Sequence, residues 1–387
     1  MNKKWLILGI TLGLVILVVG VLIWSSQGRS TPVTSTTNIT SNQPITVLTN
    51  QSAPELEFVA TQTLPSGTHR PEILYKDGKV YLVMVYPDNK NQIQHQGMVF
   101  DASDPTQIDF SRPEKQFPVS WITDNYGRGA DHRAALVGNE FWVVVQSLII
   151  DPTKNCTGGP MEPCTKSQHL IFSRFNLDGD EIATSEVTST VEFPEDNYPD
   201  MSVLAVGEHL LINTGTKMGL KISEIDADGN IIDTDEYSTS PTGILGGIGN
   251  SLFLGPDDTV LLFTSSINQI GVTKFNSDLT VVESSTFDLP DEENTFPTGV
   301  FYKDGYYYVA YSAREAGDVA IETNPLFPRL MILDQNLEVV DVIAISDEAG
   351  TGHVHPTLVI IDDVLFYAWS KKIGTTPQVQ VEQYRLE

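Results

Sequence analysis

The sequence is poor in cysteine, histidine and basic side chains, and these shortages exclude several classes of protein. Its 387 residues include two cysteines, seven histidines and 23 lysines and arginines, against 50 aspartates and glutamates. The formal net charge of −27 argues against nucleic acid as a partner, because phosphate binding needs a basic surface. The chain also lacks Gly-x-Ser-x-Gly, His-Glu-x-x-His and Walker patterns, so nothing indicates a serine esterase, a zincin or a P-loop enzyme. We expect no cofactor and no bound metal.

The two cysteines, Cys156 and Cys164, flank a turn-rich stretch that can fold back on itself. In an oxidising compartment such a pair predicts a local disulfide that pins one loop. A zinc site is the alternative, but two thiols alone do not provide its four ligands.

The N-terminus has the pattern of a membrane anchor. Residues 1–4 include Lys3 and Lys4, and residues 5–24 form an uncharged stretch with a tryptophan at each end. Twenty residues of helix span a hydrocarbon core of roughly 30 Å. The lysines keep residues 1–4 cytoplasmic, so the rest of the chain is expected outside the cell membrane, in the extracellular or periplasmic space. A cleaved signal peptide is the alternative, although no Ala-x-Ala site follows the stretch.

The remaining chain divides into a stalk and a folded domain. Residues 25–54 are rich in Ser, Thr, Asn, Gln and Pro and carry almost no charge, which predicts a flexible stalk. Residues 55–387 have no convincing helical period. Their short β-branched and aromatic runs, separated by turns, predict an all-β domain.

The folded domain is built from a repeat. Each unit begins with a hairpin of increasingly apolar strands, and these hairpins are expected near residues 69–85, 131–145, 200–207, 247–265, 296–312 and 354–369. A second, more polar hairpin follows several of them, at residues 170–188, 220–237, 271–287 and 330–345. Four strands per unit and six units predict a six-bladed β-propeller. The unit near Gly247 is faint, so five or seven blades are the alternatives.

The two ends of the domain are expected to share a blade. After Trp369 only one strand remains, at residues 378–386, so the last unit lacks its outer strand. The segment 56–63 precedes the first hairpin and has no partner there. It is predicted to complete the last blade, which closes the ring and removes open sheet edges.

Charged and imidazole side chains recur where the innermost strands begin, next to the expected central channel. They are His69, Arg70, Asp131, His132, Arg133, Asp200, His353 and His355. Four of the seven histidines lie at this position, and Arg70 and Arg133 look equivalent in neighbouring units. Two guanidinium groups in an acidic domain would concentrate and grip an anionic ligand. The alternatives are that these residues brace the blades through hydrogen bonds, or that the histidines hold a metal.

Carboxylates for acid–base chemistry would have to line the same channel mouth. By their place in the repeat, Asp131, Asp200 and Glu315 are the candidates for catalytic residues.

Two short stretches resemble propeller enzymes that act on carbohydrates. His69-Arg70-Pro71-Glu72-Ile73 resembles the Arg-Ile-Pro stretch of six-bladed sialidases, and residues 301–312 resemble a blade of the five-bladed arabinanase and xylosidase group. The resemblance implies that Arg70 would help to grip a sialic acid carboxylate. The sialidase Asp-box is absent, and His69-Arg70 stands where the arabinanase group has its catalytic aspartate.

Together these patterns favour a membrane-anchored binding module that recognises an anionic or glycan ligand, or a protein partner, at the channel mouth. The alternative is a glycosidase-like, sialidase-type hydrolase that uses carboxylates at the same place. Binding is preferred because positive and imidazole groups recur there, while no pair of catalytic carboxylates can be identified from the sequence.

Overall fold

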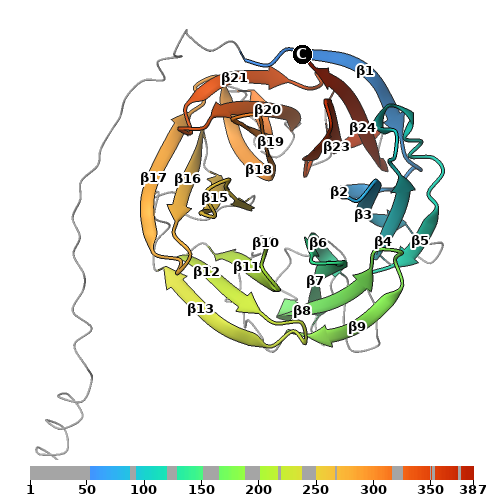
Figure 1. The fold of residues 1–387 in the computed structure, drawn as a ribbon, viewed down its shortest axis with the longest axis vertical. Helices are drawn as coiled ribbons and strands as arrows, with labels where there is room; N and C mark the ends of the chain where they lie inside the picture. The colour runs from blue at the N-terminus through green and yellow to red at the C-terminus, as the bar shows by residue number, and fades with distance from the viewer. Residues whose placement is uncertain are drawn as a thin grey trace, which may run out of the picture. The chain divides into compact units, whose positions relative to one another are not determined.

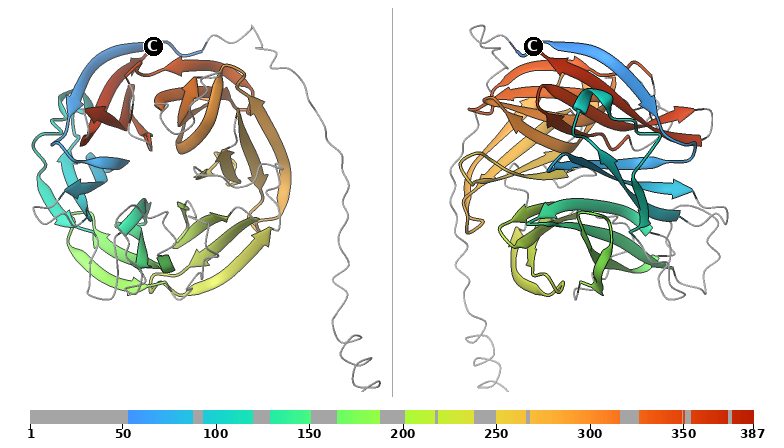
Figure 2. Two further views of the ribbon diagram at one scale, coloured as in Figure 1. Left: turned by 180° about the vertical axis from the view of Figure 1, so that it is seen from behind. Right: turned by 45° about the vertical axis from the view of Figure 1, so that its right-hand side comes forward.

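The protein is an all-β propeller of six blades (Figure 1). The computed structural model describes residues 53–87, 93–119, 129–150, 165–187, 201–216, 219–237, 250–265, 268–315, 326–348, 350, 354–373 and 376–387. Within these ranges the chain forms 24 strands and the 3-10 helix η1 (Pro105–Gln107). The strands make six antiparallel sheets of four, as the repeat predicted. Figure 2 shows the same ring from behind and at an angle.

The first five blades follow the chain from the channel outward. Blade 1 contains β2 (His69–Lys76), β3 (Lys79–Pro87), β4 (Ile93–Asp101) and β5 (Lys115–Pro118). Blade 2 contains β6 (Gly129–Val137), β7 (Glu140–Ile150), β8 (Thr165–Asn176) and β9 (Glu181–Glu186). Blade 3 contains β10 (Met201–Val206), β11 (His209–Thr216), β12 (Gly219–Ile225) and β13 (Ile231–Tyr237). Blade 4 contains β14 (Asn250–Leu254), β15 (Val260–Ser265), β16 (Gln269–Phe275) and β17 (Val281–Asp288). Blade 5 contains β18 (Glu292–Lys303), β19 (Tyr306–Glu315), β20 (Phe327–Asp334) and β21 (Val339–Ala344).

Blade 6 joins the two ends of the domain, which confirms the predicted closure. It contains β22 (Thr357–Ile361), β23 (Val364–Ile373), β24 (Thr376–Leu386) and, as its outer strand, β1 (Leu56–Thr63). The β1–β24 ladder runs from Leu56 opposite Leu386 to Thr63 opposite Gln380. Figure 1 shows β1, in blue, beside the red β24. The ring is therefore closed by hydrogen bonds between residues more than 300 positions apart.

Burial explains which residues form which strands. The second strand of each blade is covered on both faces by neighbouring blades and is largely apolar, as in β15, where every residue is buried. The outer strands face water and are polar, as in β9, where five of six residues are exposed. Asp77-Gly78 and Asp304-Gly305 both have positive φ angles, which suits the two-residue hairpin turns that join β2 to β3 and β18 to β19.

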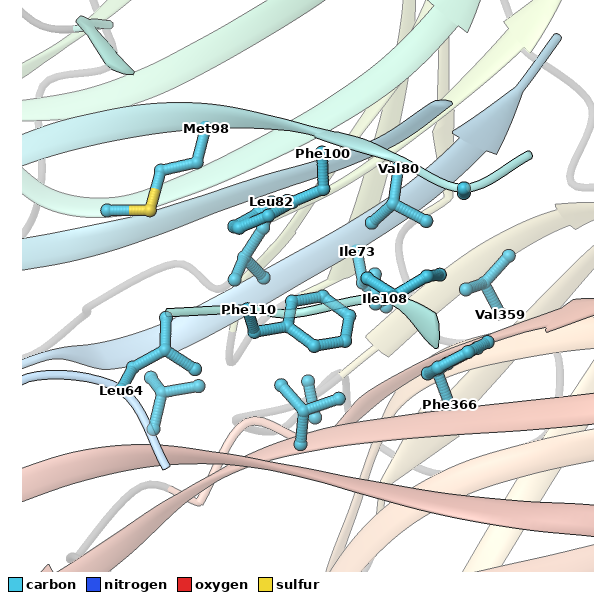
Figure 3. Close-up of a cluster of buried hydrophobic side chains, with 14 of the residues drawn as sticks. Leu64, Ile73, Val80, Leu82, Met98, Phe100, Ile108, Phe110, Val359 and Phe366 are labelled. Atoms are coloured by element: carbon cyan, nitrogen blue, oxygen red, sulfur yellow. The ribbon is translucent and has the colours of Figure 1, made fainter. Parts of the chain in front are cut away.

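The hydrophobic core lies between the blades. Figure 3 shows the cluster that joins blade 1 to blade 6, where Phe100 and Phe110 pack with Phe366. The ring centroids of Phe110 and Phe366 are 5.9 Å apart. This packing covers the junction at which the circle closes, so closure depends on apolar contact as well as on the β1–β24 ladder.

Several predictions concern parts of the chain outside the described residues. The membrane segment 5–24, the stalk up to residue 52, and Cys156 and Cys164 belong to this group. Where the structure does describe the chain, it contains no helix with the length and hydrophobicity of a membrane span.

Candidate functional site

A cavity of about 260 Å³ lies in the middle of the propeller. Its walls are the innermost strands of all six blades, β2, β6, β10, β14, β18 and β22. Each of these is the edge strand of its sheet, so one row of backbone N–H and C=O groups in each blade has no ladder partner on that side. A polar ligand or water entering the cavity meets these groups directly.

The cavity has a polar end and an apolar end. The polar end is lined by one polar side chain from each of the six inner strands: Glu72, Arg133, Ser202, Ser251, Thr298 and Thr357. Blades 1 and 2 contribute the charged pair, and the other four blades contribute hydroxyl groups. The opposite end is lined by larger apolar groups, among them Tyr75, Phe253 and Phe301. We call the polar end the channel mouth.

A second polar layer lies behind the mouth, on the second strands of five blades. Its members are Gln146, Asn213, Thr264, Ser312 and Ser370, each at most 1% exposed. Two of their contacts cross to other strands or blades: Asn213 Nδ2 donates to Asn250 Oδ1 at 2.8 Å, and Ser370 Oγ accepts from the backbone N–H of Arg70 at 2.8 Å. Burying polar groups costs free energy unless they are paired. Their concentration at one end of an otherwise apolar core therefore indicates that this end is the candidate ligand-binding end of the channel.

Four charged side chains form a network at the mouth. Arg70 Nη1 lies 3.4 Å from Asp131 Oδ1. Arg133 Nη1 lies 3.7 Å from the same oxygen and 3.7 Å from Glu72 Oε2. The charges therefore alternate in the order Arg70, Asp131, Arg133, Glu72.

Asp131 is the centre of this network and is only 1% exposed. Burial alone would raise its pKa, but Arg133 and Arg70 outweigh burial and hold the pKa well below the usual value for aspartate. His355 and His132 contribute in the same direction. Asp131 Oδ1 also accepts the backbone N–H of His132 at 2.9 Å, so the carboxylate is fixed in the ionised form.

Glu72 behaves in the opposite way. Burial raises its pKa to about 7, helped by the negative charge of Asp131 and opposed by Arg133. The two carboxyl groups near the Arg133 guanidinium group thus have pKa values that are shifted in opposite directions. Asp131 is ionised near neutral pH, whereas Glu72 titrates there.

The two arginines have different surroundings. Arg133 is 4% exposed, and it donates from Nε to the Met201 carbonyl at 2.8 Å and from Nη1 to the His132 carbonyl at 3.2 Å. It therefore links blade 2 to blade 3 and acts as a brace, the alternative considered above. The Arg70 side chain is 12% exposed and sits on a bulge of β2 with a φ angle of 54°.

Three described histidines, His69, His132 and His355, interact electrostatically with Asp131. His132 is buried against His95 of blade 1, and burial lowers its pKa well below the usual value, with His95 acting in the same direction. Burial also lowers the pKa of His69, whose Nδ1 lies 3.2 Å from the Gly67 carbonyl. His355 is 7% exposed, with a φ angle of 41°. Burial keeps His132 and His69 mostly neutral at pH 7, whereas the arginines bring positive charge to the mouth.

The structure corrects one expectation about register. Arg70 is not the equivalent of Arg133, because the register of the two hairpins places Glu72 at the position that Arg133 occupies in blade 2. Glu72 lies opposite Val83 and Arg133 opposite Val144, each four positions before the last pair of its hairpin. Glu72 is the functional candidate that sequence reasoning missed. Counting back from the turns Asp77-Gly78 and Gly138-Asn139 would have found it.

The structure describes only part of what was predicted for the other site residues. Asp200 and His353 lie outside the described residues. Glu315 pairs with Glu292 in the β18–β19 ladder, but its side chain is not described. Within the described ranges no group of three or more potential metal-ligating side chains occurs.

No protein-family model matches this chain, and no curated protein matches it in sequence. Solved structures match it in fold. Trypanosoma rangeli sialidase in complex with the inhibitor DANA superimposes with a TM-score of 0.52 at 12% identity, covering 82% of this chain and 55% of the sialidase. The phage phi92 endosialidase superimposes with a TM-score of 0.56 at 9% identity, covering 86% of this chain and 69% of that chain.

The chain thus spans about half the length of the trypanosomal sialidase. An α-L-arabinofuranosidase from Clostridium thermocellum also aligns, with a TM-score of 0.38 at 9% identity over 62% of this chain and 81% of its own. At such low identities a likeness concerns the fold and not the activity. By fold, the described chain is a six-bladed β-propeller similar to the propellers of sialidases.

Proposed function

We propose that this protein is a membrane-anchored binding module whose propeller recognises an anionic or glycan ligand at the channel mouth. The observation that carries the proposal is the charged network Arg70–Asp131–Arg133–Glu72, of which Glu72 and Arg133 line a cavity of about 260 Å³. Concave sites with a few converging polar groups are the usual places for small ligands. The hydroxyl groups of blades 3 to 6 suit the hydroxyls of a sugar, and the arginines suit a carboxylate.

An array of immobilised glycans tests this proposal. The full-length protein in mild detergent is applied to sialylated, uronic-acid, sulfated and neutral glycans. We expect retention on acidic glycans that weakens as salt is added, because charge attraction is screened. Retention on neutral glycans alone would exclude the anionic ligand, and no retention by the folded protein would direct the search to a protein partner.

A hydrolase similar to glycosidases is the second candidate, and the pair Glu72 and Asp131 favours it. Glu72 Oε2 and Asp131 Oδ1 both lie 3.7 Å from Arg133 Nη1, so they are at most twice that distance apart. This limit overlaps the range of about 5–9.5 Å for glycosidase carboxylates. However, Asp131 is paired with both arginines and is 1% exposed, which makes attack on a sugar carbon difficult. Release of a coloured phenol from aryl glycosides, abolished in Glu72→Gln, would favour the hydrolase over the binding module.

The membrane topology belongs to the same proposal. Residues 5–24 would anchor the protein in the lipid bilayer, and residues 25–54 would hold the propeller outside the cell, with Cys156 and Cys164 joined. Protease added to intact cells should release a fragment of propeller size, and protection of that fragment would contradict the orientation. Mass spectrometry without reductant decides the cysteines, because a free-thiol mass refutes the bridge.

A further inference from the structure

Glu72 is the least firmly paired charge of the mouth network. Its ion pair with Arg133 is 3.7 Å long, which is beyond hydrogen-bond distance. Asp131, by contrast, lies between two guanidinium groups and accepts a backbone N–H. Glu72 also lines the cavity, so it meets an entering ligand while Asp131 stays covered.

A ligand anion at Arg133 would compete with Glu72 for the same guanidinium group. Among the described charges of the network, an ionised Glu72 would add to Asp131 and the ligand, so that three negative charges would face Arg70 and Arg133 in a poorly solvated place, which is unfavourable. With a proton on Glu72, Arg70 and Arg133 would balance Asp131 and the ligand. The neutral carboxyl could then also donate a hydrogen bond to the ligand.

We propose that the channel mouth takes up one proton on Glu72 when it binds its anionic ligand, so that binding weakens as the pH rises above neutrality. This inference rests on the proposed function, because it concerns the regulation of the same site. By linkage, a ligand that favours the protonated carboxyl must bind less tightly wherever that carboxyl is ionised in the free protein.

The charged and titratable groups around Glu72 in the described part of the chain are His69 and Arg70 on β2, Asp131, His132 and Arg133 on β6, His95 on β4, and His355 just before β22. The arginines keep Asp131 ionised, and burial keeps His132 and His69 neutral at pH 7 and above, since it lowers the pKa of both. Burial raises the pKa of Glu72 to about 7, so its carboxyl changes charge between pH 6 and 9.

Calorimetric titration of the full-length protein tests the inference. The probes are N-acetylneuraminate and glucuronate, which stay ionised from pH 6 to 9, in two buffers with different heats of ionisation. We expect the wild type to take up a proton and to lose up to about tenfold in affinity per pH unit above 7. Glu72→Gln should bind without proton uptake and with an affinity that does not change with pH. The matched control is Glu114→Gln, an exposed carboxylate outside the cavity lining, which should follow the wild type.

The outcomes separate the inference from the proposed function. Wild-type binding that is independent of pH overturns the inference and leaves the binding module intact. If neither sugar acid binds at any pH, the proposed function is contradicted. The inference is then tested with sulfate as the anion, by following the titration of the Glu72 carboxyl with ¹³C NMR. A midpoint near neutrality that rises with sulfate supports proton-coupled anion binding, whereas an ordinary carboxyl midpoint overturns it.

Discussion

His95 and His132 bring their Nδ1 atoms within 2.8 Å of each other across the interface between blades 1 and 2. Their rings stand edge to face, with centroids 4.8 Å apart, and both are buried. One proton between the two nitrogens satisfies this contact, and protonation of both would break it. Because His132 follows Asp131 directly, the pair ties the charged network of the mouth to the third strand of the neighbouring blade.

Replacing one member of this pair should make the fold less stable and its pH dependence weaker. His95→Phe leaves His132 Nδ1 buried without its partner, at a cost of about 1–3 kcal/mol. Burial lowers the pKa of His132, so the folded state binds this proton less well than the unfolded state. The free energy of unfolding should therefore fall as the pH drops below about 6.5, the ordinary value. Urea denaturation at pH 7.5 measures the loss of stability, with the surface variant His209→Phe as control. Equal stability of His95→Phe and wild type would refute this prediction.

Glu72→Gln should stabilise the protein at alkaline pH. The pKa of Glu72 is raised from 4.5 to about 7, so its contribution to stability is present below pH 4.5 and lost as the pH rises through 7. Removing the charge should then increase the free energy of unfolding at pH 8.5 by on the order of 2–3 kcal/mol and change it little at pH 5. Denaturant titrations at both pH values provide the comparison. A variant that is less stable than wild type at pH 8.5 would show that the Arg133 ion pair outweighs burial.

Gly299 sets the width of the channel between blades 5 and 6. A Cβ atom at this position would lie 3.0 Å from Thr357 Cα and 3.3 Å from Leu358 N. These are backbone atoms of the next inner strand and cannot rotate aside, so Gly299→Ala must push β18 away from β22. We expect a loss of about 1–3 kcal/mol, together with weaker ligand binding. A melting temperature equal to that of wild type would show that the channel adjusts freely.

The closure of the ring should be essential for the whole domain. Deleting residues 55–64 removes β1 and exposes the edge of β24, so the loss should spread beyond blade 6. Thermal unfolding should shift to a clearly lower temperature in a single transition. If the truncated protein melts with the intact one, β1 contributes nothing beyond its own strand.

The sequence was sufficient for the architecture because the propeller repeats its local signals. Asp77-Gly78 and Asp304-Gly305 mark hairpins, and the unpaired strands at 56–63 and 378–386 predicted the closure that β1 and β24 confirm. The charged network was harder to predict because it depends on register. The pairing of β2 with β3 places Glu72, and not Arg70, at the position of Arg133 in the neighbouring blade. The partner of His132 lies on a third strand, where no recurring pattern points to His95.

The central claim is that Arg70 holds an anionic ligand at the mouth, and one titration tests it most directly. The wild type, Arg70→Gln and the matched control Arg329→Gln are titrated at pH 6 with the acidic glycan that the array selects. Arg329 pairs with Glu292 at 3.0 Å in blade 5 and is not part of the charged network to which Arg70 belongs. The account predicts saturable binding by wild type and Arg329→Gln, and affinity at least about tenfold weaker in Arg70→Gln, as expected for a lost charge-assisted hydrogen bond. Equal affinity of Arg70→Gln and wild type would contradict it.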